Sequence, residues 1–441
     1  MSQSCEAPPP PPSASVQVVC ANALDYLRGI DACRFHAVVT DPPYGLSEPL
    51  AGEDVAAVLA QWIAEGEHTH TKGRKKPAKP GGTDATSRLA GGGFMGAQWD
   101  SFVPGPRVWA EVLRVTRPGG FLLAFAGSRT AGWMEISLML AGWEVLDSIH
   151  WLYAEGFPKG GNVGKRTDAA EGTIWDDWST TLKPAHEPII VARRPLAERS
   201  VAANLLKWRT GALNIGACRV GTEERFNPSA ANRGATATSI MGSMGDNGSD
   251  AGGGRACVGR WPANLMLTHA ETCGDECVEG CPVRLLDEQG GERKSGSRAA
   301  GVRKGLGYHG AEGDGGPAIV ASSGGASRFF FSAKASPSDR SEGLPDGAKC
   351  DHPTVKPVPL VRELVRLVCT PGANGEPPGE VLDPFGGSGT TGVALALEGL
   401  RGLVVECDPH YACNLAAVRV NRALALATRG ECPKHWRRRG G

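Results

Sequence analysis

The 441-residue chain lacks a net charge, because 47 Lys and Arg residues balance 47 Asp and Glu residues. Overall charge therefore does not point to a polyanionic partner. The chain also lacks a long hydrophobic run: FLLAFAG at 121–127 is about the longest, and crossing a bilayer takes roughly 20 apolar residues. The first residues, MSQSCEAPPPPPSAS, have neither a basic start nor an apolar centre, which excludes a secretory signal. We expect a disordered leader at 1–15, a cytoplasmic protein and no membrane partner.

Cysteine is present but forms no disulfide pattern, since the 13 cysteines are odd in number and mostly scattered. The exception is HAETCGDECVEGC, in which His269, Cys273, Cys277 and Cys281 follow one another at four-residue steps. One His and three Cys complete a tetrahedral zinc site, whose role here would be structural. The alternative is a set of reduced thiols in a loop, because the ligands come as one run and not as two separated pairs.

Strand and helix patterns alternate through the first half of the chain. Short strands rich in β-branched residues are expected at 16–20, 35–40, 121–127, 144–153 and 186–192. Amphipathic helices are expected at 106–115 and 130–141. This alternation predicts an α/β fold with a largely parallel sheet covered on both faces.

The pattern changes between about 196 and 325, where residues 231–254 are too rich in Gly, Ser and Ala to pack and predict a flexible loop. Regular structure returns with a strand at 328–334, a helix at about 358–369 and a βαβ unit that begins at 380. Asp408 and Pro409 cap the final helix of that unit.

The stretch FHAVVTDPPYG at 35–45 ends a buried strand with an acid, two prolines and an aromatic residue. Pro42 cannot donate to a strand ladder, so the strand must stop near Asp41. The turn therefore holds one carboxylate and the ring of Tyr44 at the edge of the sheet. An ordinary turn, in which Asp41 accepts backbone N–H groups, is the structural alternative.

A second motif, VLDPFGGSGTTGVAL at 381–395, combines an acid with a glycine loop that leads into a helix. The loop lacks the lysine of a nucleoside triphosphate site, and Asp383 would repel a pyrophosphate. S-adenosylmethionine fits better, since Asp383 can accept from its ammonium while loop N–H groups meet its carboxylate. Glu406 follows 23 residues later, near the offset at which an acid reaches ribose hydroxyls. A glycine turn used only for close packing is the alternative.

Together the motifs resemble the amino-group DNA methyltransferases, in the permuted order that places DPPY before the cofactor loop. DPPY at 41–44, PTVKP at 353–357 and DPFGGSGTT at 383–391 carry the resemblance, and further runs such as GFPKGGNVGK, KPAHEPIIVARRP and FFFSAKASPSDR are similar to the phage and prophage type. It covers most of 16–425. The resemblance implies a Rossmann-like S-adenosylmethionine-dependent methyltransferase fold with an antiparallel edge strand and an inserted irregular target-recognition region.

The same resemblance implies five segments along the chain. They are the leader at 1–15, a catalytic half at 16–195, an inserted DNA-recognition region at 196–325, a cofactor-binding half at 326–427 and a basic tail at 428–441.

The implied site has a catalytic part and a cofactor-binding part. Asp41 and the carbonyl of Pro42 would accept the N–H groups of an exocyclic amine, and Tyr44 would stack on a base that has left the duplex. The catalytic residues are Asp41, Pro42, Pro43 and Tyr44, and the cofactor-binding residues are Asp383, Pro384, Phe385, Gly387, Ser388, Gly389, Thr390, Glu406, Thr354, Lys356 and Asn22. At Asn22 the family often has an acid.

The family resemblance also indicates the substrate. Adenine-N6 enzymes of the family mostly begin the tetrapeptide with Asp or Asn and cytosine-N4 enzymes with Ser, so Asp41 favours adenine. The alternatives are cytosine-N4 methylation, an inactive DNA-binding relative, or an RNA or protein amide substrate. The partner would be double-stranded DNA, bound by a monomer or homodimer, and the sequence identifies no restriction endonuclease. Basic residues at 71–79 and 434–439 are expected near DNA phosphates.

Overall fold

The computed structural model covers the whole chain and describes most of it. The described residues are 15–45, 52–65, 102–153, 162–164, 174–175, 177–227, 255–270, 272–273, 276–294, 323–334, 337–345, 348–370 and 377–436. Outside them lie the basic segment 71–79 and the Gly-rich loop 231–254. The expected leader also lies outside them except for Ser15, as does the part of the basic tail after Trp436.

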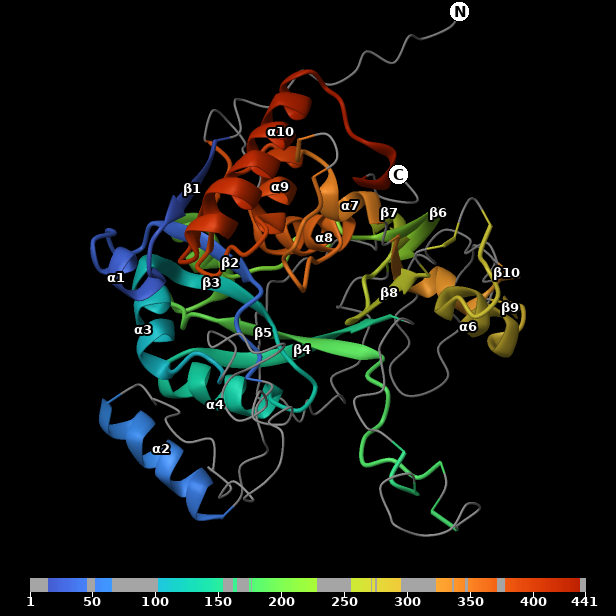
Figure 1. The fold of residues 1–441 in the computed structure, drawn as a ribbon. Helices are drawn as coiled ribbons and strands as arrows, with labels where there is room; N and C mark the ends of the chain where they lie inside the picture. The colour runs from blue at the N-terminus through green and yellow to red at the C-terminus, as the bar shows by residue number, and fades with distance from the viewer. Residues whose placement is uncertain are drawn as a thin grey trace, which may run out of the picture.

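A nine-stranded sheet forms the centre of the described structure (Figure 1). The strands follow the spatial order β1 (Val16–Cys20), β13 (Arg401–Glu406), β12 (Glu380–Asp383), β2 (Phe35–Thr40), β3 (Thr116–Phe125), β5 (His186–Arg193), β4 (Glu144–Leu152), β8 (Leu265–His269) and β11 (Phe331–Lys334). All neighbouring pairs are parallel except those that β5 forms with β3 and β4. The predicted α/β fold with a largely parallel sheet is confirmed.

Helices cover both faces of this sheet, as its apolar strands require. In β2, Ala37 and Val39 belong to the core on one face and Val38 to the core on the other. Figure 1 shows the two helical layers. One contains α8 (Val358–Val368), α9 (Thr390–Leu397) and α10 (Ala417–Thr428), and the other contains α1 (Ala23–Arg28), α3 (Pro106–Val115) and α4 (Ala131–Leu140), on which α2 (Glu53–Glu65) packs.

One expectation about the sheet is wrong: the antiparallel strand is not at its edge. β5 lies between β3 and β4, and β8 and β11 extend the sheet beyond β4. Residue pairing is parallel between β4 and β8 and between β8 and β11. The region at 196–325 therefore contributes a strand to the central sheet, which its irregular composition did not reveal.

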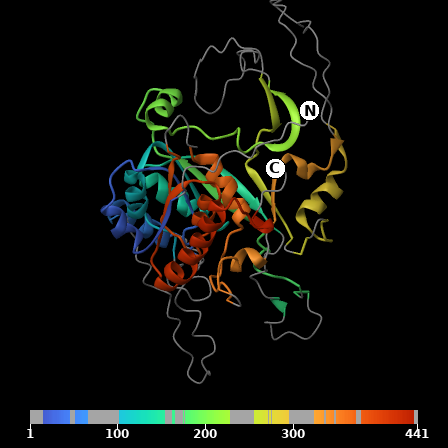
Figure 2. The same cartoon turned by 90° about the horizontal axis from the view of Figure 1, so that it is seen from above.

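Two smaller sheets, one before and one after β8 in the chain, accompany the central sheet. β6 (Val220–Asn227) and β7 (Arg255–Arg260) pair as an antiparallel hairpin, and β9 (Arg293–Lys294) pairs with β10 (Ser323–Gly324). Figures 1 and 2 place α6 (Pro282–Gly290) at the end of the molecule opposite α1. These units therefore extend the end of the sheet that β8 and β11 form.

The final helix begins as predicted, with Asp408 as its cap and Pro409 as its first residue. Asp408 caps it, because its carboxylate accepts from the N–H groups of His410 and Tyr411. After Pro409 and His410, residues Tyr411–Ala416 form an unpredicted π-helical turn before α10 continues. π turns occur often at functional sites, and this one packs against the glycine loop.

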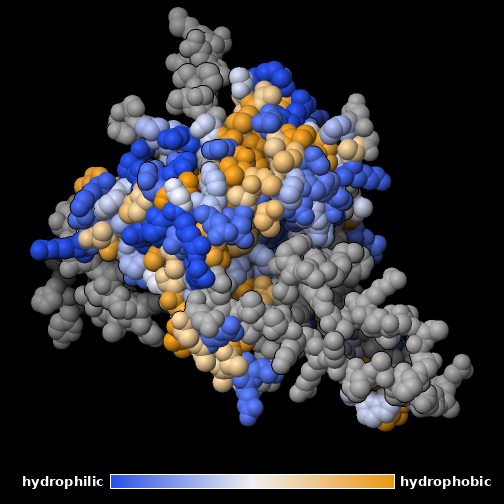
Figure 3. All heavy atoms as spheres, turned by 60° about the vertical axis from the view of Figure 1, so that its left-hand side comes forward, coloured by the Kyte–Doolittle hydropathy of each residue, from blue (hydrophilic) through white to orange (hydrophobic). Residues whose placement is uncertain are grey.

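Among the described residues, no helix is both long and apolar enough to span a bilayer. The face shown in Figure 3 mixes hydrophilic and hydrophobic residues, as folded protein surfaces ordinarily do.

Candidate active site

The catalytic turn and the glycine loop meet at neighbouring strand ends. β2 and β12 are adjacent and parallel, so Thr40 and Asp383 end side by side although they are 343 residues apart in sequence. The Thr40 hydroxyl donates to Oδ1 of Asp383 at 2.6 Å. A cleft of about 1310 Å³ opens at this edge and is lined by both motifs. Ligands of open α/β sheets bind at such carboxyl edges.

The carboxylate of Asp41 is held by two neighbours. Nζ of Lys356 donates to Oδ2 at 2.7 Å, and the hydroxyl of Tyr44 lies 2.8 Å from Oδ1. The ammonium of Lys356 also lies 5.1 Å from the centres of the Tyr44 and Phe125 rings. PTVKP, expected to contact cofactor, therefore contacts the catalytic turn directly.

Glu187, at the start of β5, completes this cluster and was not identified from the sequence. Its Oε2 lies 2.8 Å from the Tyr44 hydroxyl and 3.4 Å from Nζ of Lys356. One hydroxyl proton serves one carboxylate at a time, so Asp41 and Glu187 compete for it. The available signals were an acid directly before the apolar run PIIVA and its place in the segment KPAHEPIIVARRP.

Burial and charge set the ionisation of this cluster. Burial tends to lower the pKa of Lys356, which is 6% exposed, but the carboxylates of Asp41 and Glu187 outweigh it and raise that pKa overall. The pKa of Tyr44 is raised well above its usual value, first by burial and then by the same two carboxylates. Lys356 is therefore a charged ammonium and Tyr44 a neutral phenol at neutral pH.

Asp383 is buried beneath the cleft, with 2% of its surface exposed. Burial raises its pKa to about 6, although hydrogen bonds from Thr40, Thr391 and the N–H of Phe385 oppose the shift. The nearby Asp41 carboxylate raises it further. Such a carboxyl group gains from a cationic ligand, since a positive charge favours its ionised form.

The glycine loop is shaped by packing as well as by ligand access. Gly387 and Gly389 have φ values of +49° and +78°, which residues other than glycine rarely adopt. A Cβ at Gly389 would lie 2.7 Å from Cα of Ala416 in the π-helical turn. Gly389 therefore serves close packing, which was the alternative interpretation of this motif.

Glu406 fixes the loop from the end of β13. Its Oε2 accepts from the N–H of Gly387 at 2.7 Å, and its Oε1 accepts from the N–H of Asp408 at 2.8 Å. Each carboxylate oxygen keeps a further lone pair, so ribose hydroxyls can still be accepted from the cleft.

Ser388 and Thr390 contact a buried arginine that the sequence did not single out. Arg419 of α10 is 0% exposed and donates to the carbonyl of Ser388 at 2.7 Å. The same Nη1 lies 3.1 Å from Oγ of Ser388 and 3.2 Å from Oγ1 of Thr390, and Nη2 donates to the carbonyl of Asp339 at 2.9 Å. No sequence pattern marked Arg419 as buried, because an arginine in a helix is usually exposed.

Most of the expected site residues line the same cleft. Pro384, Gly389 and Asn22 do not line it: Gly389 packs on Ala416, and the exposed Asn22 caps α1 by accepting from the N–H of Asp25 at 3.3 Å. The cleft-lining residues are Asp41, Pro42, Pro43, Tyr44, Thr354, Lys356, Asp383, Phe385, Gly387, Ser388, Thr390 and Glu406. The His and Cys residues gather elsewhere, at the end of β8.

Comparison with known families matches the part of the chain that carries the glycine loop and the PTVKP segment, but not the DPPY turn. Residues 321–417 match the DNA methylase family of N6/N4 methyltransferases. The DNA methylase match runs from β10 to the π-helical turn and contains Lys356, Asp383 and Glu406.

One relative found by sequence and two solved structures show what this chain is similar to. Type II methyltransferase M.HindIII of Haemophilus influenzae is 24% identical over 205 residues, which are 44% of this chain, and the chain spans only 63% of that relative. The crystal structure of M1.HpyAVI has a TM-score of 0.38 at 12% identity and covers 92% of this chain and 98% of its own. PvuII DNA methyltransferase, described as cytosine-N4-specific, has a TM-score of 0.40 at 13% identity and covers 96% of each chain.

Proposed function

We propose that the protein is a DNA methyltransferase that transfers a methyl group from S-adenosylmethionine to an exocyclic amine, most favourably N6 of adenine. One observation carries the proposal: the DPPY turn and the glycine loop line one cleft, and a hydrogen bond between Thr40 and Asp383, 343 residues apart, joins the strands that end there. The DNA methylase match over 321–417 supports the same reaction class. The reaction needs both motifs, and the fold brings both to the same sheet edge.

The residues on the loop side suit S-adenosylmethionine, whose sulfonium supplies an electrophilic methyl group. Asp383 is buried and its pKa is raised to about 6, so a cationic ligand relieves an unfavourable charge there. Glu406 retains lone pairs for ribose hydroxyls, and its hydrogen bonds to Gly387 and Asp408 hold it in place. Phe385 lines the cleft and packs against Trp109, with ring centres 5.8 Å apart, which offers an apolar wall for an adenine ring.

The residues on the turn side suit a planar amine. Lys356 and Tyr44 each occupy one oxygen of Asp41, so the carboxylate is fixed and keeps lone pairs for the amine N–H groups. Acceptors fixed in this way stabilise the positive charge that grows on nitrogen during transfer, without reorganising. Tyr44 lines the cleft and offers its ring to a base that has left the duplex. In direct transfer the N–C bond forms as the S–C bond of the sulfonium breaks, S-adenosylhomocysteine leaves, and the methylated amine then loses one proton to water. This path requires no covalent enzyme intermediate.

Cytosine-N4 methylation is the second candidate, because the same acceptors fit its amine. Asp41 as the first residue of the tetrapeptide favours adenine through the family resemblance. The proposed partner is double-stranded DNA, and the proposed location is the cytoplasm. The basic segment 71–79 is proposed to contact DNA phosphates, so neutralising Lys72, Arg74, Lys75 and Lys76 should flatten the salt dependence of DNA binding.

Tritium transfer from labelled S-adenosylmethionine to unmethylated plasmid DNA tests the proposal. Asp41→Ala should abolish transfer because it removes the fixed acceptor, whereas cofactor binding should persist. Asp25→Ala is the matched control, since Asp25 is an exposed acid whose side chain pairs with Arg28 of its own helix. Full transfer by Asp41→Ala would contradict the proposed role of the turn.

A further inference from the structure

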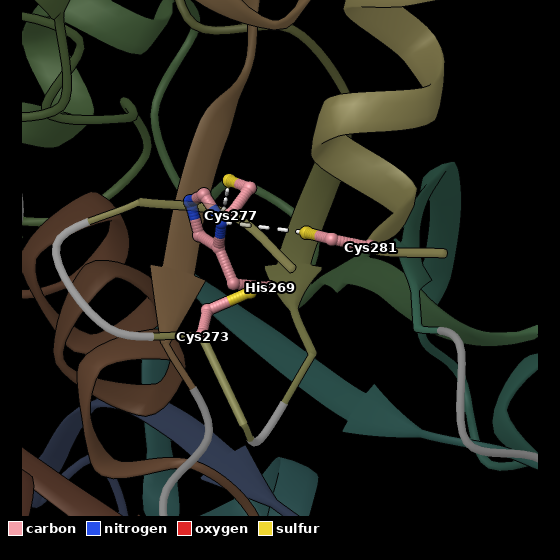
Figure 4. A group of neighbouring side chains, drawn as sticks. All are labelled: His269, Cys273, Cys277 and Cys281. Atoms are coloured by element: carbon pink, nitrogen blue, oxygen red, sulfur yellow. Dashed lines mark hydrogen bonds between the residues drawn. The ribbon is translucent and has the colours of Figure 1, made fainter. Parts of the chain in front are cut away.

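Four potential metal ligands converge where β8 ends (Figure 4). His269 is the last residue of β8, Cys281 lies directly before α6, and Cys273 and Cys277 come from the segment between them. The ligand atoms of the four side chains all lie within 4.8 Å of one another. The even spacing in sequence is thus folded into a compact cluster.

The distances within the cluster suit a zinc ion. Zn–S bonds of about 2.3 Å and Zn–N bonds of about 2.0 Å place neighbouring sulfur and nitrogen ligands roughly 3.6 Å apart on a tetrahedron. Nδ1 of His269 lies 3.2 Å from Sγ of Cys277 and 3.6 Å from Sγ of Cys281. A single ring nitrogen shares one proton at most, yet this one faces two sulfurs, so hydrogen bonding alone does not account for the arrangement.

The surroundings of the cluster also match a metal centre. His269, Cys273 and Cys281 are 6%, 3% and 0% exposed, so three of the four ligands are shielded from water. The local core is small, with Leu267 and Val283 as its other buried members. A region with so little apolar core needs another source of stability.

We propose that His269, Cys273, Cys277 and Cys281 bind one zinc ion. Four protein ligands complete a tetrahedral shell, so the ion is structural and takes no part in the chemistry. It ties the end of β8 to the start of α6. Thr268, next to His269, lines the cleft and accepts from Nε1 of Trp151, so the ion also steadies one wall of that cleft.

Metal analysis of the whole protein tests this inference independently of any methylation. Protein purified without chelator should contain one equivalent of zinc, and protein produced with cobalt should show the visible absorption bands of tetrahedral thiolate-bound cobalt. Cys281→Ser should lower zinc retention at least about tenfold. Cys218→Ser is the matched control, because Cys218 is a buried cysteine outside the cluster, and it should retain the full equivalent.

Two results would overturn the inference. One is native protein with less than about a tenth of an equivalent of zinc that still fails to retain zinc added under reducing conditions. The other is a disulfide between two of the three cluster cysteines, found by peptide mapping without reduction. The cobalt spectrum is measured on the native chain, so the inference stays testable even if Cys281→Ser does not fold.

Discussion

Lys356 is the residue whose replacement tests the catalytic cluster most sharply. Replacing it with Met keeps most of the side-chain volume but removes the ammonium that lies 2.7 Å from Asp41 and 3.4 Å from Glu187. Breaking a buried ion pair costs about 3–5 kcal/mol. The two carboxylates are 22% and 20% exposed, so water offsets part of that cost and we expect a loss of about 2–3 kcal/mol.

Chemical denaturation of a double-mutant cycle measures this loss. Glu187→Gln removes one of the two carboxylates that Lys356 neutralises and keeps a hydrogen-bonding group beside Tyr44. The double variant Lys356→Met with Glu187→Gln should therefore be more stable than the sum of the two single changes predicts, by at least about 0.5 kcal/mol. Strictly additive effects, or a loss below about 1 kcal/mol for Lys356→Met, would refute the cluster as described.

Three further predictions concern the cleft and the glycine loop beside it. The pKa of Asp383 rises from its ordinary value of 3.8 to about 6 on folding, so the folded state binds the extra proton and the free energy of unfolding should fall by about 2 kcal/mol between pH 4 and 6. Asp383→Asn should lack this fall, and parallel stability curves for the two proteins would contradict the burial argument. Gly389→Ala should destabilise by about 2 kcal/mol or more, whereas Gly430→Ala, with a similar φ of +68° and nothing within 4 Å, should cost only about 1 kcal/mol; equal losses in denaturation would exclude the contact with Ala416. Tyr44→Ala should weaken the binding of a substrate base by about 1–3 kcal/mol while Tyr44→Phe, which keeps the ring, should not, as measured by titration with DNA carrying an unpaired target base; equal weakening would argue against stacking.

The sequence predicted local structure best where side-chain periodicity was strong. The helix expected at 106–115 is α3, in which Trp109 and Val112 are fully buried. The βαβ unit after 380 is equally close to its prediction, because a short strand, glycines and a capping acid each leave a local signal. Local patterns therefore sufficed for most elements that position the site.

What the sequence missed depends on contacts between distant segments. Glu187 joins Tyr44 and Lys356 only because β5 inserts antiparallel beside β3, and no local pattern encodes that placement. Arg419 is buried with its guanidinium donating to the glycine loop and to the carbonyl of Asp339, although its position in a helix suggested exposure. β8 joins the central sheet through parallel pairing with β4, which a short apolar segment in a Gly-rich region did not indicate.

The central claim is methyl transfer to a base in duplex DNA, and nucleoside mass analysis tests it most directly. Unmethylated plasmid would be incubated with the protein and S-adenosylmethionine, digested completely and compared with a reaction that lacks cofactor. We predict N6-methyladenine that depends on cofactor and disappears with Asp41→Ala. No methylated nucleoside, from protein that still binds S-adenosylmethionine, would contradict the claim and redirect the search to RNA or protein substrates.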